Sequence, residues 1–154
     1  MVKDAAQRAE LAKLYHEAWW AKRRDQGIHG PEDIKPEDKT HMSAMKLADE
    51  MGNAPVMVLI CATAKGAGAM GSVIPSAQNM LLAARALGIG GTITTLHGQV
   101  EERVHALFDI PETWQVVYCM PLGYPRGNFG SVVRKPLSEV CSLNHYGTPP
   151  SWAS

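Results

Sequence analysis

The chain has 154 residues, 45% of them hydrophobic, and its 15 basic and 15 acidic residues leave a formal net charge of zero. This length suits one globular domain, and no apolar run approaches the ~20 residues that a membrane span needs. The balanced charge, without a long run of one sign, argues against binding to nucleic acid or to an anionic membrane.

The first third of the chain predicts two helices separated by a loop. Residues 4–26 have a helix-forming composition with apolar residues at helical spacing, and Gly27 is placed to end the helix. The charged segment 28–39 contains two prolines and is typical of a mobile surface loop. Thr40 is placed to cap a second helix, which we expect over residues 40–51.

The rest of the chain predicts a mixed fold. Two continuous apolar runs, 55–62 and 114–120, have the length and composition of strands that are covered on both faces. Between them, residues 75–88 are apolar on nearly every side and predict a helix inside the protein. Residues 99–108 predict a further helix with one apolar face. Because no repeat or second core is visible, we expect a single α+β domain over residues 1–154.

Cysteine and histidine usage bears on location and on metals. The three cysteines, Cys61, Cys119 and Cys141, are far apart and lie in or beside apolar segments, which is typical of free thiols in a reducing compartment. The N-terminus lacks the hydrophobic core of a signal peptide, so we expect a cytoplasmic protein. The six histidines show no i,i+4 pair, and no metal site is predicted.

A glycine-rich segment invites a nucleotide-binding interpretation. Residues Gly66 to Gly71 fit the pattern G-x-G-x-x-G between a predicted strand and a predicted helix, as in dinucleotide-binding folds. That fingerprint needs an acidic residue about twenty positions further on, and none occurs between Gly66 and Gln99. A flexible loop of small residues is therefore the favoured interpretation.

Two other places have the chemistry of a binding site. Gly88 suits the end of a helix, whereas Gly90 and Gly91 exceed what a cap needs and let the backbone pass close to a flat ligand. The Thr-rich segment that follows offers backbone amides as donors. Arg134 and Lys135 precede a Pro-Leu pair, and a guanidinium held by a rigid neighbour suits a phosphate, although two solvated charges are the alternative.

An ordered series of segments carries a family resemblance: 72–90, 109–112, 122–125 and 134–140. In order and spacing they resemble the C-terminal half of the FMN-dependent nitroreductase family. The resemblance implies a nitroreductase-like α/β/α sandwich with a central, mainly antiparallel sheet. It also implies a homodimer that joins through long helices and binds FMN between its subunits, with NAD(P)H as the reductant and a nitroaromatic or quinone as the acceptor.

The resemblance also assigns site residues. In the family, backbone amides of the segment matching Ile93 to Leu96 meet the N5 and O4 edge of the flavin, and the basic residue matching Arg134 reaches the FMN phosphate. The cofactor carries the chemistry, so no catalytic side chain is expected. The candidate cofactor-binding residues are Gly91, Ile93, Thr94, Thr95, Leu96 and Arg134.

One departure from the family pattern leaves a second hypothesis open. Family members usually begin with an Arg-rich segment that grips the FMN phosphate, and no such segment occurs in this sequence. The resemblance therefore predicts an N-terminally shortened oxidoreductase. The alternative is a flavin-free homologue that acts as a structural or binding protein through the charged loop 28–39.

Overall fold

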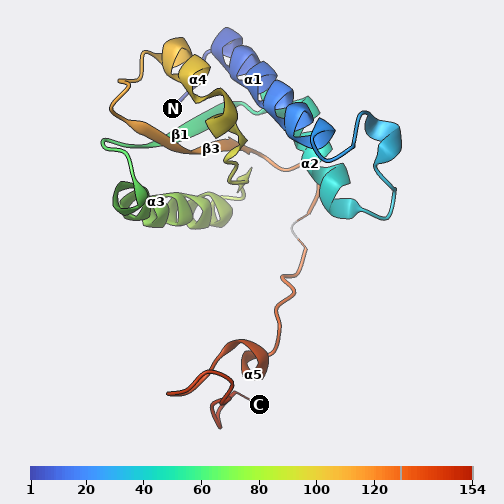
Figure 1. Cartoon of the computed structure of the whole chain (residues 1–154), viewed down its shortest axis with the longest axis vertical. Coiled ribbons are helices and arrows are strands. Elements are labelled where there is room, and N and C mark those ends of the chain that lie inside the picture. The colour runs from blue at the N-terminus through green and yellow to red at the C-terminus, as the bar shows by residue number, and fades with distance from the viewer. Residues whose placement is uncertain (129, 154) are drawn as a thin grey trace.

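The computed structural model describes residues 1–128 and 130–153. Within these residues, a three-stranded antiparallel sheet of order β1-β3-β2 lies between helices, with α1 and α4 on one face and α3 on the other (Figure 1). The predicted α/β/α sandwich is confirmed. Its elements are α1 (Ala5–Arg24), η1 (Pro31–Asp33), α2 (Lys39–Glu50), η2 (Met51–Asn53), β1 (Val56–Ala62), α3 (Ala67–Ala86), β2 (Gly90–Gly91), η3 (Leu96–Val100), α4 (Glu101–Phe108), β3 (Gln115–Gly123) and α5 (Leu137–Val140).

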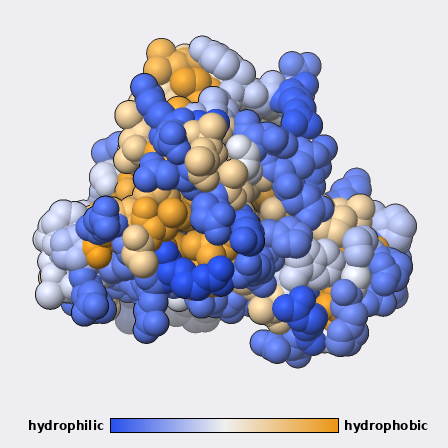
Figure 2. Space-filling model, turned by 90° about the horizontal axis from the view of Figure 1, so that it is seen from above, coloured by the Kyte–Doolittle hydropathy of each residue, from blue (hydrophilic) through white to orange (hydrophobic). Residues whose placement is uncertain are grey.

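The long amphipathic helix predicted at the N-terminus is present as α1. Asp4 caps it by accepting a hydrogen bond from the Gln7 N–H at 2.9 Å, and Gly27 follows it with a left-handed φ of 78°. Leu11 and Trp19, each 1% exposed, pack its inner face into the core. The face seen from above, which carries α1 and α4, is mainly hydrophilic with smaller hydrophobic patches (Figure 2).

The second helix begins earlier than the sequence predicted because a different residue caps it. The Asp38 carboxylate accepts a hydrogen bond from the His41 N–H at 3.0 Å, so the helix starts at Lys39. The predicted Thr40 cap is therefore wrong, and Thr40 lies in the first turn of α2. Asp38 reaches the free N–H groups from outside the helix, which a residue already inside the first turn cannot do.

The sheet separates two hydrophobic clusters, as the alternation of side chains along a strand requires. On β1, Met57 contributes to the core under α1, whereas Val58 and Ile60 contribute to the core under α3. The register between β1 and β3 shifts after Ile60, so β3 contains a β-bulge. β3 also extends three residues beyond its predicted end at Met120, because its last residues pair with both β1 and β2.

Helix α3 corrects two predictions. It begins at Ala67, so the glycine-rich segment forms its first turn and not a flexible loop. The prediction that this helix is buried is also wrong: Ala77 is fully buried against the sheet, but Leu82 is 58% exposed and Leu87 is 71% exposed. In one chain the helix has the sheet as its neighbour on a single side, so its remaining apolar surface lies open.

The C-terminal arm, which we define as residues 124–153 without residue 129, leaves the body of the molecule. Figure 1 shows it running away from the sheet and α2 and carrying α5 at a distance from them. Several of its apolar side chains lie in the open, among them Val133 at 89% and Leu137 at 53% exposure. After α5 the described residues form no helix or strand. No helix within the described residues is long and apolar enough to cross a membrane.

Candidate functional site

The segment that follows β2 lines a cleft of about 730 Å³. The rest of the lining comes from α2, between Lys39 and Leu47, and from Tyr15 of α1. The structure thus brings four of the six predicted site residues together, at the edge of the sheet. The lining residues are Tyr15, Lys39, Thr40, Ser43, Ala44, Leu47, Thr92, Ile93, Thr94, Thr95 and Leu96.

Thr94 attaches this wall of the cleft to the central strand. Its N–H donates to the Cys119 carbonyl and its carbonyl accepts from the Cys119 N–H, both at 3.0 Å. Thr94 is 7% exposed, and its side chain hydrogen-bonds with Tyr15. Burial raises the pKa of the Tyr15 hydroxyl, with the Thr94 hydrogen bond acting in the opposite direction, so this phenol stays protonated at neutral pH.

These hydrogen bonds decide which backbone amides remain available to a ligand. The Thr94 N–H is occupied by Cys119, and the Leu96 N–H lies 3.4 Å from the Thr94 hydroxyl oxygen. Within the described part of the chain, the N–H groups of Ile93 and Thr95 have no acceptor. Because an unpaired N–H beside a cleft is satisfied by solvent or ligand, Ile93 and Thr95 are the candidate donors.

Gly91 has a structural reason to be glycine. It pairs with Leu122 in the sheet, and a Cβ atom at this position would clash with the Leu122 side chain and approach the Leu81 side chain to 3.2 Å. It lines a neighbouring hollow that lacks Ile93 to Leu96. Gly88, by contrast, has a left-handed φ of 74° directly after α3, which fits the predicted cap.

Arg134 lies in the C-terminal arm, just before α5, and does not line the cleft of its own chain. Its side chain is exposed, and Nη1 donates to the neighbouring Val133 carbonyl at 3.1 Å. Figure 1 shows α5 well separated from α2, which forms the cleft wall. The structure therefore does not bring Arg134 together with Thr95 within one chain.

Sequence reasoning missed the α2 side of the cleft. Lys39, Thr40 and Ser43 line it. Polar contacts that link Asp38, His41 and Arg23 hold the first turn of α2 in place. His41 Nδ1 lies 2.6 Å from the Asp38 carboxylate, and His41 Nε2 lies 2.6 Å from Arg23 Nη1. Hydrogen bonds from His41 lower the pKa of Asp38, so this cap is ionised at neutral pH. The sequence marks a helix start here, but its proximity to residues 92–96 is tertiary information.

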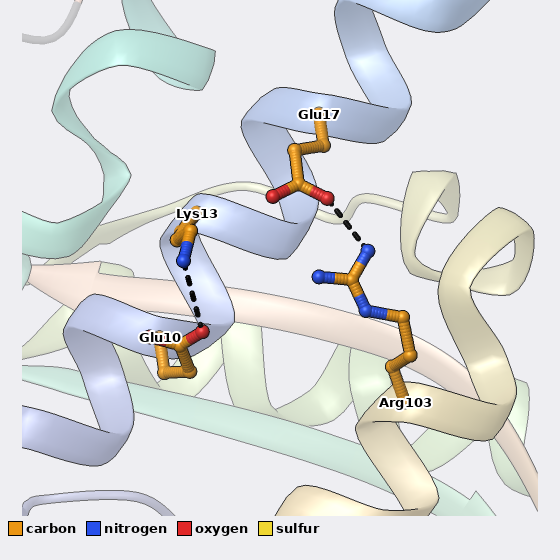
Figure 3. Close-up of polar contacts among 4 residues, drawn as sticks. All are labelled: Glu10, Lys13, Glu17 and Arg103. Atoms are coloured by element: carbon orange, nitrogen blue, oxygen red, sulfur yellow. Dashed lines mark hydrogen bonds and ion pairs between the residues drawn. The ribbon is translucent and has the colours of Figure 1, made fainter.

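Other polar clusters have structural explanations. Arg103 of α4 reaches Glu17 of α1 at 2.6 Å, and Lys13 lies 3.5 Å from Glu10 on α1 (Figure 3). The Arg103 hydrogen bond lowers the pKa of Glu17, but both side chains are exposed, so the pair contributes little to stability. Among the described residues, no group of three or more His, Cys, Asp or Glu side chains is arranged to hold a metal.

Cys61 and Cys119 lie in surroundings that disfavour a nucleophilic thiolate. Cys119 is fully buried, and burial raises the pKa of its thiol to about 12, so the reactive thiolate is absent at neutral pH. Burial also raises the pKa of Cys61. Cys141, in the C-terminal arm, is a free thiol like the other two. These positions fit the interpretation of Cys61 and Cys119 as core residues.

Comparison with known proteins agrees with this geometry. The sequence pattern of the nitroreductase family matches residues 1–124. The chain belongs to the nitroreductase family. The match covers α1 and α2 as well as segments 72–90 and 109–112 of the resemblance, and it ends before segment 134–140, which contains Arg134. No match was found among curated protein sequences.

Solved structures share the nitroreductase-type fold. Oxidized iodotyrosine deiodinase bound to FMN and 3-iodo-L-tyrosine matches with a TM-score of 0.66 at 17% identity, over 96% of this chain and 73% of that one. A nitroreductase from Bacteroides fragilis NCTC 9343 with bound FMN has a TM-score of 0.58 at 22% identity, over 87% of this chain and 69% of that one. A nitroreductase-like family protein from Bacillus cereus has a TM-score of 0.57 at 13% identity, over 88% of this chain and 67% of that one. These matches support a flavin oxidoreductase-like fold.

Proposed function

We propose that the protein is an FMN-dependent oxidoreductase that passes hydride from NAD(P)H through FMN to a nitroaromatic or quinone acceptor. The observation that carries this proposal is the cleft in which a pinned backbone turn offers the Thr95 N–H. Membership of the nitroreductase family and the FMN in two of the similar structures support the choice of cofactor. The deiodinase among them makes a halogenated aromatic a further acceptor to assay.

The residues present fit a flavin. Its ring needs hydrogen-bond donors along one edge and apolar contacts on its faces. The Thr95 N–H supplies a donor without an internal partner, Lys39 supplies a positive charge, and Ile93 and Leu47 supply apolar surface. The cleft of about 730 Å³ is within the size range of cofactor pockets.

The role of the chain in this mechanism is to bind and orient. FMN, when bound, supplies the hydride-transfer chemistry. The Thr94–Cys119 hydrogen bonds fix the turn to the central strand, so the Thr95 N–H has a defined direction before any ligand arrives. Such a preorganised donor needs no rearrangement when negative charge develops beside it. Tyr15 supports the same turn from α1 through its bond with Thr94.

The cofactor site is completed by a second copy of the chain. Leu82 on α3, Leu87 directly after it, and apolar side chains of the arm such as Val133 are exposed in the single chain. A second copy covers such surfaces by symmetric pairing. In this homodimer the arm of one subunit delivers Arg134 to the FMN phosphate held by the other, because Arg134 lies away from the cleft of its own chain.

Titration of the purified protein with FMN tests the proposal. We expect quenching of flavin fluorescence with saturation, bleaching of the flavin absorbance by NADPH or NADH, and recovery when a nitroaromatic or a quinone is added. Light scattering on the same sample should give the mass of two chains. A protein that leaves flavin fluorescence unchanged would contradict the proposal and favour the flavin-free binding protein.

A further inference from the structure

His97 is a buried polar side chain beside the cleft that does not line it. It follows the cleft residue Leu96 directly, is 2% exposed, and has its Nε2 atom 2.9 Å from the Val116 carbonyl oxygen. Since a carbonyl only accepts hydrogen bonds, Nε2 carries the proton and donates it. His97 therefore connects the end of the cleft segment to β3 through one directed bond.

The acceptor of this bond lies where β3 is irregular. The pairing of β1 with β3 passes from Tyr118 to Val116, which places Val117 in the β-bulge. A bulge interrupts the ladder of backbone hydrogen bonds, so a side chain that bonds to the backbone there supports it. The same strand is held by Thr94 at Cys119. The turn containing Thr95 is thus attached to β3 on both of its sides.

A purely space-filling role does not account for an imidazole at this position. Removing a polar ring from water costs free energy that a hydrocarbon side chain of similar volume avoids. Burial accordingly lowers the pKa of His97, which is neutral at pH 7. What the imidazole adds is a donor for the Val116 carbonyl, and a hydrogen bond to a buried backbone group contributes to local stability.

We propose that His97 is a positioning residue whose hydrogen bond to Val116 holds the 94–97 turn in the conformation that presents the Thr95 N–H to the cleft. The expected effect on FMN affinity rests on the proposed flavin site, whereas the effect of His97 on the conformation of the turn does not. His97 then acts on cofactor affinity without touching the cofactor.

Two substitutions separate the hydrogen bond from the volume. His97→Leu keeps a side chain of comparable size and removes the donor, whereas His97→Gln retains an N–H donor at a similar distance from the backbone. His105→Leu is the matched control, because His105 is also buried, at 8% exposure, but lies on α4. Each variant is compared with wild type by amide hydrogen exchange without FMN and by FMN titration.

We expect His97→Leu to accelerate exchange of the Thr94 N–H, which is hydrogen-bonded to Cys119, about tenfold more than exchange in β1, and to weaken FMN binding by about tenfold. His97→Gln should recover most of both effects, and His105→Leu should show neither local effect. Equal acceleration in β1 and in the turn would overturn the proposal, since it indicates a loss of global stability only. Local acceleration with unchanged FMN affinity would overturn it as well.

Failure of the proposed function is distinguishable from failure of this inference. A wild-type protein that does not bind FMN removes the flavin site. The exchange pattern of His97→Leu, measured without FMN, still decides whether His97 holds the turn. Accelerated exchange confined to residues 94–97 supports that role, and unchanged exchange there overturns it.

Discussion

Thr95 and Gly91 lie four residues apart and illustrate different uses of backbone near the cleft. Among the described residues the Thr95 N–H has no acceptor, whereas its neighbour Thr94 makes both hydrogen bonds to Cys119 of the central strand. Gly91 does not line this cleft, and the absence of a side chain there leaves room for the side chains of Leu122 and Leu81. A glycine beside a binding segment is thus explained by packing, and we expect its replacement to act on stability first.

Gly91→Ala should lower the free energy of unfolding by ~1–3 kcal/mol, because overpacking displaces the Leu122 and Leu81 side chains. Gly98→Ala is the control, since a Cβ atom at Gly98 meets nothing within 4 Å and its φ is not left-handed. Urea unfolding of both variants measures the difference. Equal stability of the two variants would show that β2 adjusts without cost.

The neutral state of His97 predicts acid sensitivity. Burial lowers its pKa in the folded chain, whereas in the unfolded chain it titrates near ~6.5, so the unfolded state binds the proton first as the pH falls. Well above that pH, His97 is neutral in both states and the free energy of unfolding is at its full value. Below that pH the free energy of unfolding falls, by up to ~1.4 kcal/mol per pH unit for one proton. The hydrogen bond to the Val116 carbonyl and, after it, the negative charge of Glu101 reduce but do not reverse this shift.

Urea unfolding at pH 7.5, 6.5 and 5.5 checks this expectation. Wild type should lose stability across the series, and His97→Gln, which has no titrating ring, should give a flatter profile. A variant with the same slope as wild type would assign the acid sensitivity to other groups.

At the scale of elements, α2 contributes more to the cleft than its sequence indicates. Asp38 caps it, His41 and Arg23 brace its first turn, and Lys39 then lies on the cleft wall. The N-terminal end of a helix favours negative charge, which suits an electron-rich cofactor edge or a phosphate. α3 contributes in a different way, since it covers one face of the sheet and leaves the apolar side chain of Leu82 exposed.

Lys39→Ala should weaken FMN binding by about fivefold at low ionic strength, and the effect should shrink as salt is added because the side chain is exposed. Lys22→Ala, which removes an exposed charge of α1 outside this cleft, is the control. The fluorescence titration gives both dissociation constants. An equal affinity for the two variants would exclude Lys39 from the site.

At the scale of the whole molecule, the arm separates Arg134 from the cleft to which the family resemblance assigns it. One chain carries both parts of the proposed site but does not bring them together. In the proposed homodimer a second chain would bring the two parts together and would also cover the exposed apolar side chains at α3. Completion of the proposed FMN site therefore depends on the proposed dimerisation.

Arg134→Ala should weaken FMN binding by ~2 kcal/mol, and Arg134→Lys should recover only part, because an ammonium cannot make two parallel bonds to a phosphate. Mixing Arg134→Ala with Thr95→Pro, which lacks the N–H in the cleft, tests delivery between subunits. After refolding together, heterodimers should regain one intact site in two. No recovery would place Arg134 in the site of its own chain or outside any site.

Much of the fold was determined by the sequence itself, because local patterns act over short distances. The 3.6-residue spacing of residues 4–26 predicts α1, and the apolar runs 55–62 and 114–120 predict β1 and β3. The family follows from the order of its segments. The candidate segment Ile93 to Leu96 also came from local chemistry, as glycines followed by backbone donors.

Only the tertiary structure decided how these parts meet. Thr94 pairs with Cys119 and His97 reaches Val116, and these contacts join residues far apart in the sequence, which no local pattern encodes. Burial of α3 depends on what packs on its second side, and one chain places nothing there. The distance between Arg134 and the cleft was not predictable for a similar reason. The path of an extended segment depends on the surface that it packs against, and the sequence of the segment does not specify that surface.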